Sequence, residues 1–159
     1  MRKSVTGDDD HKLWWLLTYA RRALYKLRSR ELFQYGITPE EATVLFIVKA
    51  IGRKATPAEI SRWTLRESHS ISGLLMRMEK KGLINKVKDL DKKNLVRIVI
   101  TRKGQKAYLN STKREIIHKV LNYLTKEDRN QLRILLEKIR AGAFNEGAMD
   151  RIPPFPNFD

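Results

Sequence analysis

The sequence contains no cysteine. Disulfide bonds, thiolate zinc sites and thiol-based oxidant sensing are therefore excluded together. Long hydrophobic runs are also missing, because the longest, such as Leu13–Leu17 and Val44–Val48, are far too short to span a bilayer. The segment from Met1 to His11 holds three consecutive aspartates and leads into no apolar stretch of signal-peptide form. We therefore expect a cytoplasmic protein with no membrane partner.

Motifs of catalysis and of cofactor binding are absent as well. No nucleophile–base pair, P-loop or dinucleotide fingerprint occurs along the chain. His11, His69 and His118 do not follow the spacing of a metal-ligand motif. Asp89 and Asp91 stand in a basic, polar stretch, where aspartates form turns. The prediction is a protein that is not an enzyme and has neither a cofactor nor a metal.

Positive charge, by contrast, is abundant. The 159 residues include 33 Lys and Arg against 18 Asp and Glu, a formal net charge of +15. Such an excess attracts polyanions, so DNA, RNA and an acidic membrane surface are the candidate partners. A basic surface that is merely solvated is the alternative that charge alone leaves open. The length suits one domain with a real hydrophobic core.

Three helix starts are marked in the first half of the chain. From His11 to about Phe33, leucines recur at spacings of three and four, which predicts a long amphipathic helix. The tetrads Thr38-Pro39-Glu40-Glu41 and Thr56-Pro57-Ala58-Glu59 then repeat one pattern, with Thr at the N-cap, Pro at N1 and Glu at N3. Each predicts a capping box, in which the Thr oxygen and the Glu carboxylate accept backbone N–H groups reciprocally.

The residues from Ser68 onward predict a helix followed by a β-hairpin. One apolar stripe at helical spacing contains Ile71, Leu74, Leu75 and Met78. Gly82 is expected to end this helix. The period then changes, so that 83–88 and 95–100 are predicted strands and 89–94 a polar turn. The short helix from Pro57 and the helix from Ser68 together have the pattern of a helix-turn-helix, whose second helix enters the major groove.

The last third of the chain is predicted to be helical again. Thr101 is expected to cap one helix that continues to about Leu124. The stretch Thr125-Lys126-Glu127-Asp128 is expected to cap the last helix, which ends near Gly142. The residues that follow are expected to be extended.

The positive charge coincides with the helix-turn-helix. Between Arg53 and Arg102 there are thirteen Lys or Arg and five Asp or Glu, a net charge of +8. On the helix from Ser68, small and polar residues let the backbone approach base edges, and the helix N-terminus attracts a phosphate. The predicted DNA contacts of this helix are His69, Ser70, Ser72, Gly73 and Arg77. Those of the hairpin wing and its flanks are Lys92, Lys93, Arg97, Arg62 and Arg66. This combination of shape and charge favours double-stranded DNA as the partner.

Several stretches resemble one known family. They are TPAEIS at 56–61, SISGLLMRMEKKGLI at 70–84, ITRKG at 100–104 and LTKED at 124–128. Together they are similar to the MarR family of bacterial regulators, over about Trp14 to Ile139. The resemblance implies a homodimer whose N- and C-terminal helices interlock, with two winged domains that read a near-palindromic site. It also implies that Ser68, Ser70 and Ser72 face DNA and that Arg77 contacts a phosphate.

Two positions depart from the family pattern. Gly73 stands where many members carry arginine. The usual Asp-x-Arg wing motif is Asp91-Lys92-Lys93-Asn94 in this chain, with Arg97 displaced along the strand. Lys92 or Lys93 is therefore expected to replace the arginine of the wing tip.

The first helix carries aromatic residues with two possible uses. Trp14, Trp15 and Tyr19 lie at helical spacing, which favours packing or dimer contact. A cage for an aromatic ligand is the alternative, since the resemblance implies that some members bind small aromatic anions. The residues expected at the dimer interface are Trp14, Leu17, Leu24, Leu121, Leu124, Leu135 and Leu136.

The predicted fold is mainly α with a small β-hairpin wing, a winged helix-turn-helix flanked by N- and C-terminal dimerisation helices. The DNA-binding domain is expected at 38–101, the dimerisation helices at 11–35 and 102–142, and tails at 1–10 and 143–159. The predicted function is a homodimeric, sequence-specific transcriptional regulator, a repressor more than an activator, with a small-molecule effector as a possible releasing partner. Two alternatives stay open: a nucleoid protein that binds DNA without sequence preference, and a winged-helix adaptor that binds an acidic protein.

Overall fold

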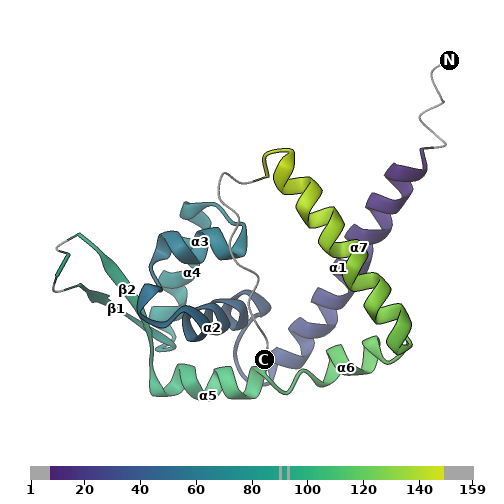
Figure 1. Cartoon of the computed structure of the whole chain (residues 1–159). Helices are drawn as coiled ribbons and strands as arrows, with labels where there is room; N and C mark the ends of the chain where they lie inside the picture. The colour runs from purple at the N-terminus through teal and green to yellow at the C-terminus, as the bar shows by residue number, and fades with distance from the viewer. Residues whose placement is uncertain (1–7, 90, 93, 149–159) are drawn as a thin grey trace.

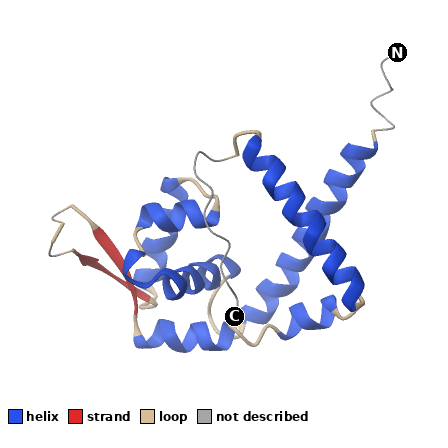
Figure 2. Cartoon of the chain, in the orientation of Figure 1, coloured by secondary structure: helices blue, strands red, loops and turns tan. Residues whose placement is uncertain are grey.

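The computed structural model describes residues 8–89, 91–92 and 94–148. Its elements, in chain order, are α1 (Asp9–Phe33), α2 (Pro39–Ile51), the 3-10 helix η2 (Gly52–Lys54), α3 (Pro57–Thr64), α4 (Ser68–Lys80), β1 (Ile84–Lys88), β2 (Val96–Ile100), α5 (Arg102–Ser111), α6 (Glu115–Leu121) and α7 (Lys126–Asn145). Figure 2 shows a mostly helical chain with one two-stranded ribbon. The predicted fold class, mainly α with a hairpin wing, is confirmed.

A hydrophobic core unites helices α2 to α5 with the hairpin, and α1 enters it through its last turn at Leu32. The stripe predicted on α4 is buried, since Ile71, Leu74, Leu75 and Met78 are at most 4% exposed. The strands pair antiparallel, and the Ile98 N–H donates to the Ala55 carbonyl at 2.8 Å. This bond fastens the base of the wing to the start of α3. In Figure 1 the N-terminal part of α1 and the helix α7 extend away from this unit.

Threonine caps mark the starts of α2 and α3. Thr38 accepts the Glu41 N–H, and the Glu41 carboxylate accepts the Thr38 N–H at 3.0 Å, which is the predicted capping box. Thr56 likewise accepts the Glu59 N–H. The Glu59 carboxylate, however, binds Arg62 at 2.6 Å, so the second predicted box is only half formed. A charged partner one turn on competes successfully with a backbone N–H for that carboxylate.

The C-terminus of α4 is closed by glycine, as predicted. Gly82 has φ of +73°, and its N–H donates to the Glu79 carbonyl at 2.9 Å. The Leu83 N–H donates to the Met78 carbonyl at 2.9 Å, which completes a Schellman motif. The turn leads Leu83 directly into the core, where it is 2% exposed.

The single helix predicted from Thr101 to about Leu124 is wrong, because the structure contains two helices there. Thr101 caps α5 as expected and accepts the Gly104 N–H at 3.0 Å. The helix then ends at Ser111, and α6 begins at Glu115 after a residue of left-handed backbone, Arg114 at φ +50°. Residues of α1 contact both sides of this break.

Both terminal helices are longer than predicted. Asp8 is the N-cap of α1, which begins at Asp9, two residues before the expected start. Thr125 and Asp128 form the capping box of α7, as the sequence predicts. The helix then continues to Asn145, three residues beyond Gly142. No helix in the described ranges has the length and apolar character required to cross a membrane.

Gly104 lies where the first turn of α5 crosses the base of the wing. A Cβ at this position would lie 2.0 Å from the Leu83 carbonyl oxygen and 2.9 Å from Ile100 Cγ2. Glycine is therefore required by close backbone approach, and not by a left-handed conformation.

Gly104→Ala is expected to lower the free energy of unfolding by about 3 kcal/mol, because backbone must move to admit the methyl group. Urea denaturation measures this change. Gly142→Ala is the matched control, since nothing lies within 4 Å of that Cβ in α7. It is expected to raise stability by about 0.5–1 kcal/mol through helix propensity. Equal stabilities for the two variants would contradict the close approach.

Candidate DNA-binding surface and adjoining pocket

The face of α4 opposite its buried stripe carries the predicted recognition residues. Ser68, His69, Ser72 and Arg77 are exposed, and Ser70 and Gly73 are partly exposed. The Ser72 hydroxyl donates to the Ser68 carbonyl at 3.0 Å, so it offers acceptor lone pairs to a ligand. Glu67, the N-cap, forms no side-chain cap bond. The first N–H groups of α4 thus keep the positive helix end available for an anion.

Arg77 lies back along this face over Gly73. Its Nη1 is 3.5 Å from the point that a Cβ on Gly73 would occupy. The guanidinium thereby fills the space beside the position where the family pattern has an arginine. In the described part of the chain Arg77 takes part in no ion pair, so its charge is available to a ligand.

An ion pair joins the loop end of the wing to its second strand. Arg97 Nη2 lies 2.5 Å from Asp89 Oδ2, and the Asp89 side chain is 6% exposed. Asp89 Oδ1 also accepts the Asp91 N–H at 2.9 Å, in the turn that the sequence predicts for these aspartates. Lys92 is exposed in the loop. Lys93 lies outside the described residues.

Two arginines flanking α4 are likewise engaged inside the protein. Arg62 pairs with Glu59, and Arg66 Nη2 lies 3.3 Å from Glu40 Oε1. Together with Arg97, these are three of the five wing and flank residues predicted to contact DNA, and that role stays a prediction for each. Within the described residues from 53 to 102, the cations without an ion pair are Arg53, Lys54, Arg77, Lys80, Lys88, Lys92 and Arg102.

A second surface is apolar and lies on the helices that flank the winged helix. No residue of α6 or α7 is buried within the single chain. Trp14 is 55% exposed on α1, and Leu135 is 53% exposed on α7. Further exposed residues on these two helices are Leu17, Leu24, Leu132, Leu136 and Ile139. The ring of Trp15 stacks on Tyr19 at 5.2 Å between centroids, so the aromatic residues pack along α1.

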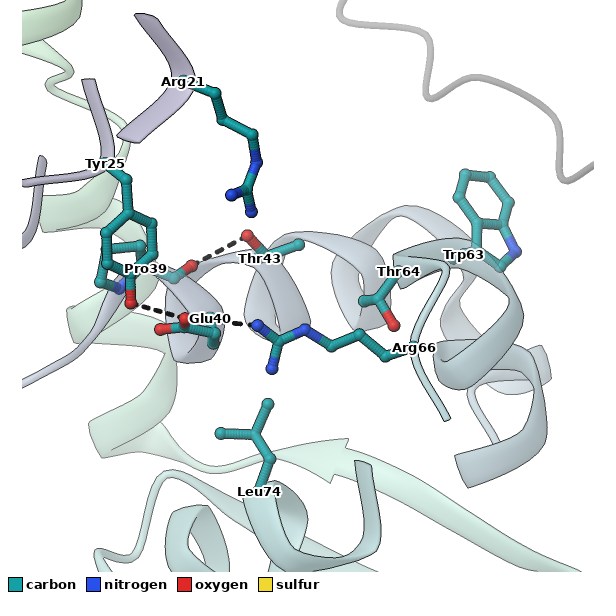
Figure 3. Close-up of a pocket in the computed structure, with 9 residues that line it drawn as sticks. All are labelled: Arg21, Tyr25, Pro39, Glu40, Thr43, Trp63, Thr64, Arg66 and Leu74. Carbon is teal, nitrogen blue, oxygen red and sulfur yellow. Dashed lines mark hydrogen bonds and ion pairs between the residues drawn. The ribbon is translucent and has the colours of Figure 1, made fainter. Parts of the chain in front are cut away.

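A cavity of about 260 Å³ lies among α1, α2, α3 and the start of α4. Its lining consists of Arg21, Tyr25, Pro39, Glu40, Thr43, Trp63, Thr64, Arg66 and Leu74 (Figure 3). No local sequence motif marks this cavity, because its walls come from four separate elements. Arg21 reaches toward the cavity from α1 (Figure 3) and forms no ion pair within the described residues.

One chain of polar contacts crosses the cavity wall. The Tyr25 hydroxyl donates to Glu40 Oε1 at 2.5 Å, and Arg66 approaches the same oxygen. Burial, and then the neighbouring Glu40 carboxylate, raise the pKa of Tyr25. Burial alone would raise the pKa of Glu40, but the hydrogen bond from Tyr25, further hydrogen bonds and the Arg66 charge lower it below its ordinary value. At neutral pH the tyrosine is therefore neutral and the glutamate ionised.

This architecture is similar to that of known proteins. Residues 35–93, which contain α2, α3, α4 and the start of the wing, match the model of the MarR family. Over these residues the chain is similar to the MarR family. No functionally curated protein matches the sequence.

Solved structures of MarR-type regulators share the fold over most of the chain. The organohalide-sensing RdhR transcriptional regulator, in a form bound to 2,4-dichlorophenol, is 27% identical, with a TM-score of 0.85 over 99% of this chain and 96% of that chain. A mutant MarR from E. coli complexed with operator DNA is 19% identical, with a TM-score of 0.76 over 80% of this chain and 93% of its own. The S. aureus MepR–DNA complex is 22% identical, with a TM-score of 0.74 over 85% of this chain and 99% of its own. The last two likenesses concern the fold alone.

The ion pair with Arg97, at the loop end of the wing, is expected to affect the pKa of Asp89. The hydrogen bond from the Asp91 N–H, followed by Arg97, lowers the pKa of the Asp89 carboxyl. Its contribution to stability is therefore complete above the pKa of the unfolded chain and is lost as pH falls through the folded value. We expect Arg97→Gln to raise the pKa of Asp89, yet to leave it below its ordinary value because the Asp91 N–H remains. Carboxyl-carbon NMR titration measures both.

Asp128 supplies the internal control for this titration. Hydrogen bonds from the Thr125 hydroxyl and N–H lower its pKa at the start of α7, remote in sequence from the wing. The pKa of Asp128 should therefore be the same in both proteins. An Asp89 carboxyl that titrates identically with and without Arg97 would disprove the ion pair.

Proposed function

We propose that the protein is a homodimeric transcriptional regulator that binds double-stranded DNA at a near-palindromic operator. It acts as a cytoplasmic repressor, has no enzymatic activity, and is released from DNA by a small aromatic effector. The observation that carries the proposal is the outward face of α4 on a MarR-type winged helix, where Arg77 and the exposed N-terminal turn have no partner charge among the described residues. Lys92 adds a charge on the wing.

Dimerisation is supported by the apolar residues that the single chain leaves exposed. A 20-residue helix with no buried residue, α7, gains little from packing within its own chain. Apolar stripes on α1 and α7 become stable when a second copy covers them. Within the segments predicted to dimerise, 11–35 and 102–142, we assign the dimer contacts to α1, α6 and α7, because α5 packs into the core of the winged helix. Residues 38–101 are proposed to form each DNA-binding domain. Two-fold symmetry then spaces the two α4 helices about 34 Å apart, one turn of DNA.

Phosphate contacts are expected to supply most of the affinity for DNA, so binding should fall steeply with salt. With six or more phosphates contacted, affinity decreases about 10³-fold between 50 and 200 mM salt. Arg77→Ala and Lys92→Ala should each weaken binding about tenfold. Lys119→Ala is the matched control, because Lys119 is exposed on α6, which Figure 1 places far from the wing. Fluorescence anisotropy with a labelled duplex measures all four proteins.

Footprinting, together with these binding measurements, separates the rival functions. A discrete protected palindrome in footprints of genomic fragments supports the regulator, whereas uniform coating of DNA indicates a nucleoid protein. Retention of DNA that does not change in Arg77→Ala and Lys92→Ala indicates an adaptor whose basic face binds protein. Affinity that does not depend on salt would contradict the proposal itself.

The effector is proposed from the cavity and from one relative. The RdhR regulator has been crystallised with 2,4-dichlorophenol, and it matches this chain over almost its full length. In this chain the Arg21 side chain points toward the cavity (Figure 3), and a cation there suits a ligand that carries an acidic hydroxyl or carboxylate. Arg66, which also lines the cavity, lies two residues before α4. An effector that binds one arrangement of Arg66 more tightly therefore shifts the position of α4.

Isothermal titration with 2,4-dichlorophenol tests the cavity. We expect Arg21→Gln to weaken binding about tenfold, because the anionic form of the ligand loses its cation. Arg22→Gln is the control for charge, since Arg22 is exposed on the same helix and does not line the cavity. Equal affinities for the two variants would place the ligand elsewhere.

A further inference from the structure

Two charged residues of α1 meet the chain where α5 ends and α6 begins. Arg28 and Glu31 form an ion pair, and their side chains are only 15% and 12% exposed. The Arg28 guanidinium also donates through Nη2 to the carbonyl of Ser111, the last residue of α5. Glu31 Oε1 accepts the N–H of Ile116, in the first turn of α6, at 3.0 Å. One pair thus contacts both sides of the break, more than 80 residues away in sequence.

The pair acts as a cap for both helices. Arg114, the N-cap residue of α6, makes no side-chain cap bond, so the carboxylate of Glu31 takes that role from another helix. Arg28 does the same for a carbonyl at the C-terminus of α5. The charges match the helix ends, since an anion stabilises an N-terminus and a cation a C-terminus.

The residues between the two helices, 112–114, are Thr-Lys-Arg, with neither glycine nor proline, and after Leu109 the next apolar residue is Ile116. The hydroxyls of Ser111 and Thr112 donate to the carbonyls of Tyr108 and Leu109, so polar side chains favour the end of α5 locally. Left-handed backbone at Arg114 is less stable than helical backbone, because the residue carries a Cβ. A continuous helix would satisfy the same backbone groups without that cost. Contacts from outside the segment must therefore offset the difference.

The ionised state of Glu31 is maintained by the same contacts. Burial alone would raise the pKa of Glu31, but the hydrogen bond from the Ile116 N–H and the hydrogen bond and charge of Arg28 outweigh it. The net effect lowers the pKa below its ordinary value. The Glu31 carboxylate is therefore charged at neutral pH and accepts hydrogen bonds from Arg28 and from the Ile116 N–H.

The location of the break gives the pair a role in DNA recognition. Helix α5 packs against α2 in the winged helix, whereas α6 and α7 belong to the proposed dimer. We propose that Arg28 and Glu31 are positioning residues that hold the α5–α6 break and so set the spacing of the two α4 helices in the dimer. Without the pair, α5 and α6 merge into one helix and the angle between the two parts of the chain changes. This inference rests on the proposed function for its consequence on DNA.

The first experiment measures tolerance of operator spacing. An operator is obtained by binding-site selection with the unaltered protein, and its half-sites are then moved closer or apart by one and two base pairs. The unaltered protein should lose about tenfold in affinity for each altered spacing, because two rigidly held helices fit one separation. Arg28→Gln and Glu31→Gln should lose only about threefold. Arg30→Gln, an exposed arginine on the same helix, is the control and should behave as the unaltered protein.

The second experiment needs no DNA. Because the sequence has no cysteine, Met76→Cys introduces a single thiol for a spin label on the exposed face of α4. The label-to-label distance in the free dimer should be narrowly distributed, and it should broaden or shift in Arg28→Gln and Glu31→Gln. Far-UV circular dichroism should show added helix in both variants, as residues 112–114 become helical.

The outcomes keep the two proposals apart. If the unaltered protein selects no paired half-sites, the proposed function fails, and circular dichroism still decides whether the pair holds the break. If the variants keep the spacing preference, the label distance and the helix content, and lose only resistance to urea, the inference is overturned. If Arg28→Gln does not fold, Arg28→Lys replaces it in both experiments. Lysine keeps the positive charge, but it lacks the planar guanidinium that bridges Glu31 and Ser111, so the same results are expected.

Discussion

The burial of one stripe of α4 is the constraint on which the rest of the structure depends. Once Ile71, Leu75 and Met78 face the core, the rotation of the helix is fixed, and its other side must face solvent. The Schellman turn at Gly82 and the bond from Ile98 to Ala55 then fix where the wing stands relative to that helix. The surface proposed to read DNA is therefore a consequence of core packing, and it needs no strain of its own.

The large positive charge of the chain is divided between two tasks. Some cations form ion pairs between parts of the fold. Lys81, after α4, binds the buried carboxylate of Glu41 on α2, and Arg97 on β2 binds Asp89 at the loop end of the wing. Others, such as Arg77 and Lys92, have no such bond among the described residues. The second group contributes most to attraction of a polyanion, because the carboxylate of an ion pair cancels much of the cation's field at distances beyond the pair. Net charge alone thus overstates the surface that is available to DNA.

The sequence predicted those features whose causes are local. Thr38 with Glu41 and Thr125 with Asp128 cap their helices as expected, and Gly82 ends α4, since each depends on residues a few positions apart. The break between α5 and α6 escaped prediction because the side chains that bond to both helix ends, Arg28 and Glu31, lie on another helix. The cavity escaped for the same reason: Arg21, Glu40 and Trp63 become neighbours only after folding. On the surface of α4 the sequence predicted which residues face outward, but it did not predict that Arg77 lies over Gly73.

That last contact changes how this chain should be compared with its relatives. The family pattern has an arginine at the position of Gly73, whereas in this chain a guanidinium lies beside that position and belongs to Arg77, one helical turn later. An arginine side chain attached at residue 77 approaches the DNA groove at a different angle from one attached at residue 73, and its conformational freedom also differs. Some regulators carry an arginine at the position of Gly73. A base preference transferred from them by position alone would be assigned to Gly73, although the guanidinium here belongs to Arg77. The two positions therefore have to be compared together.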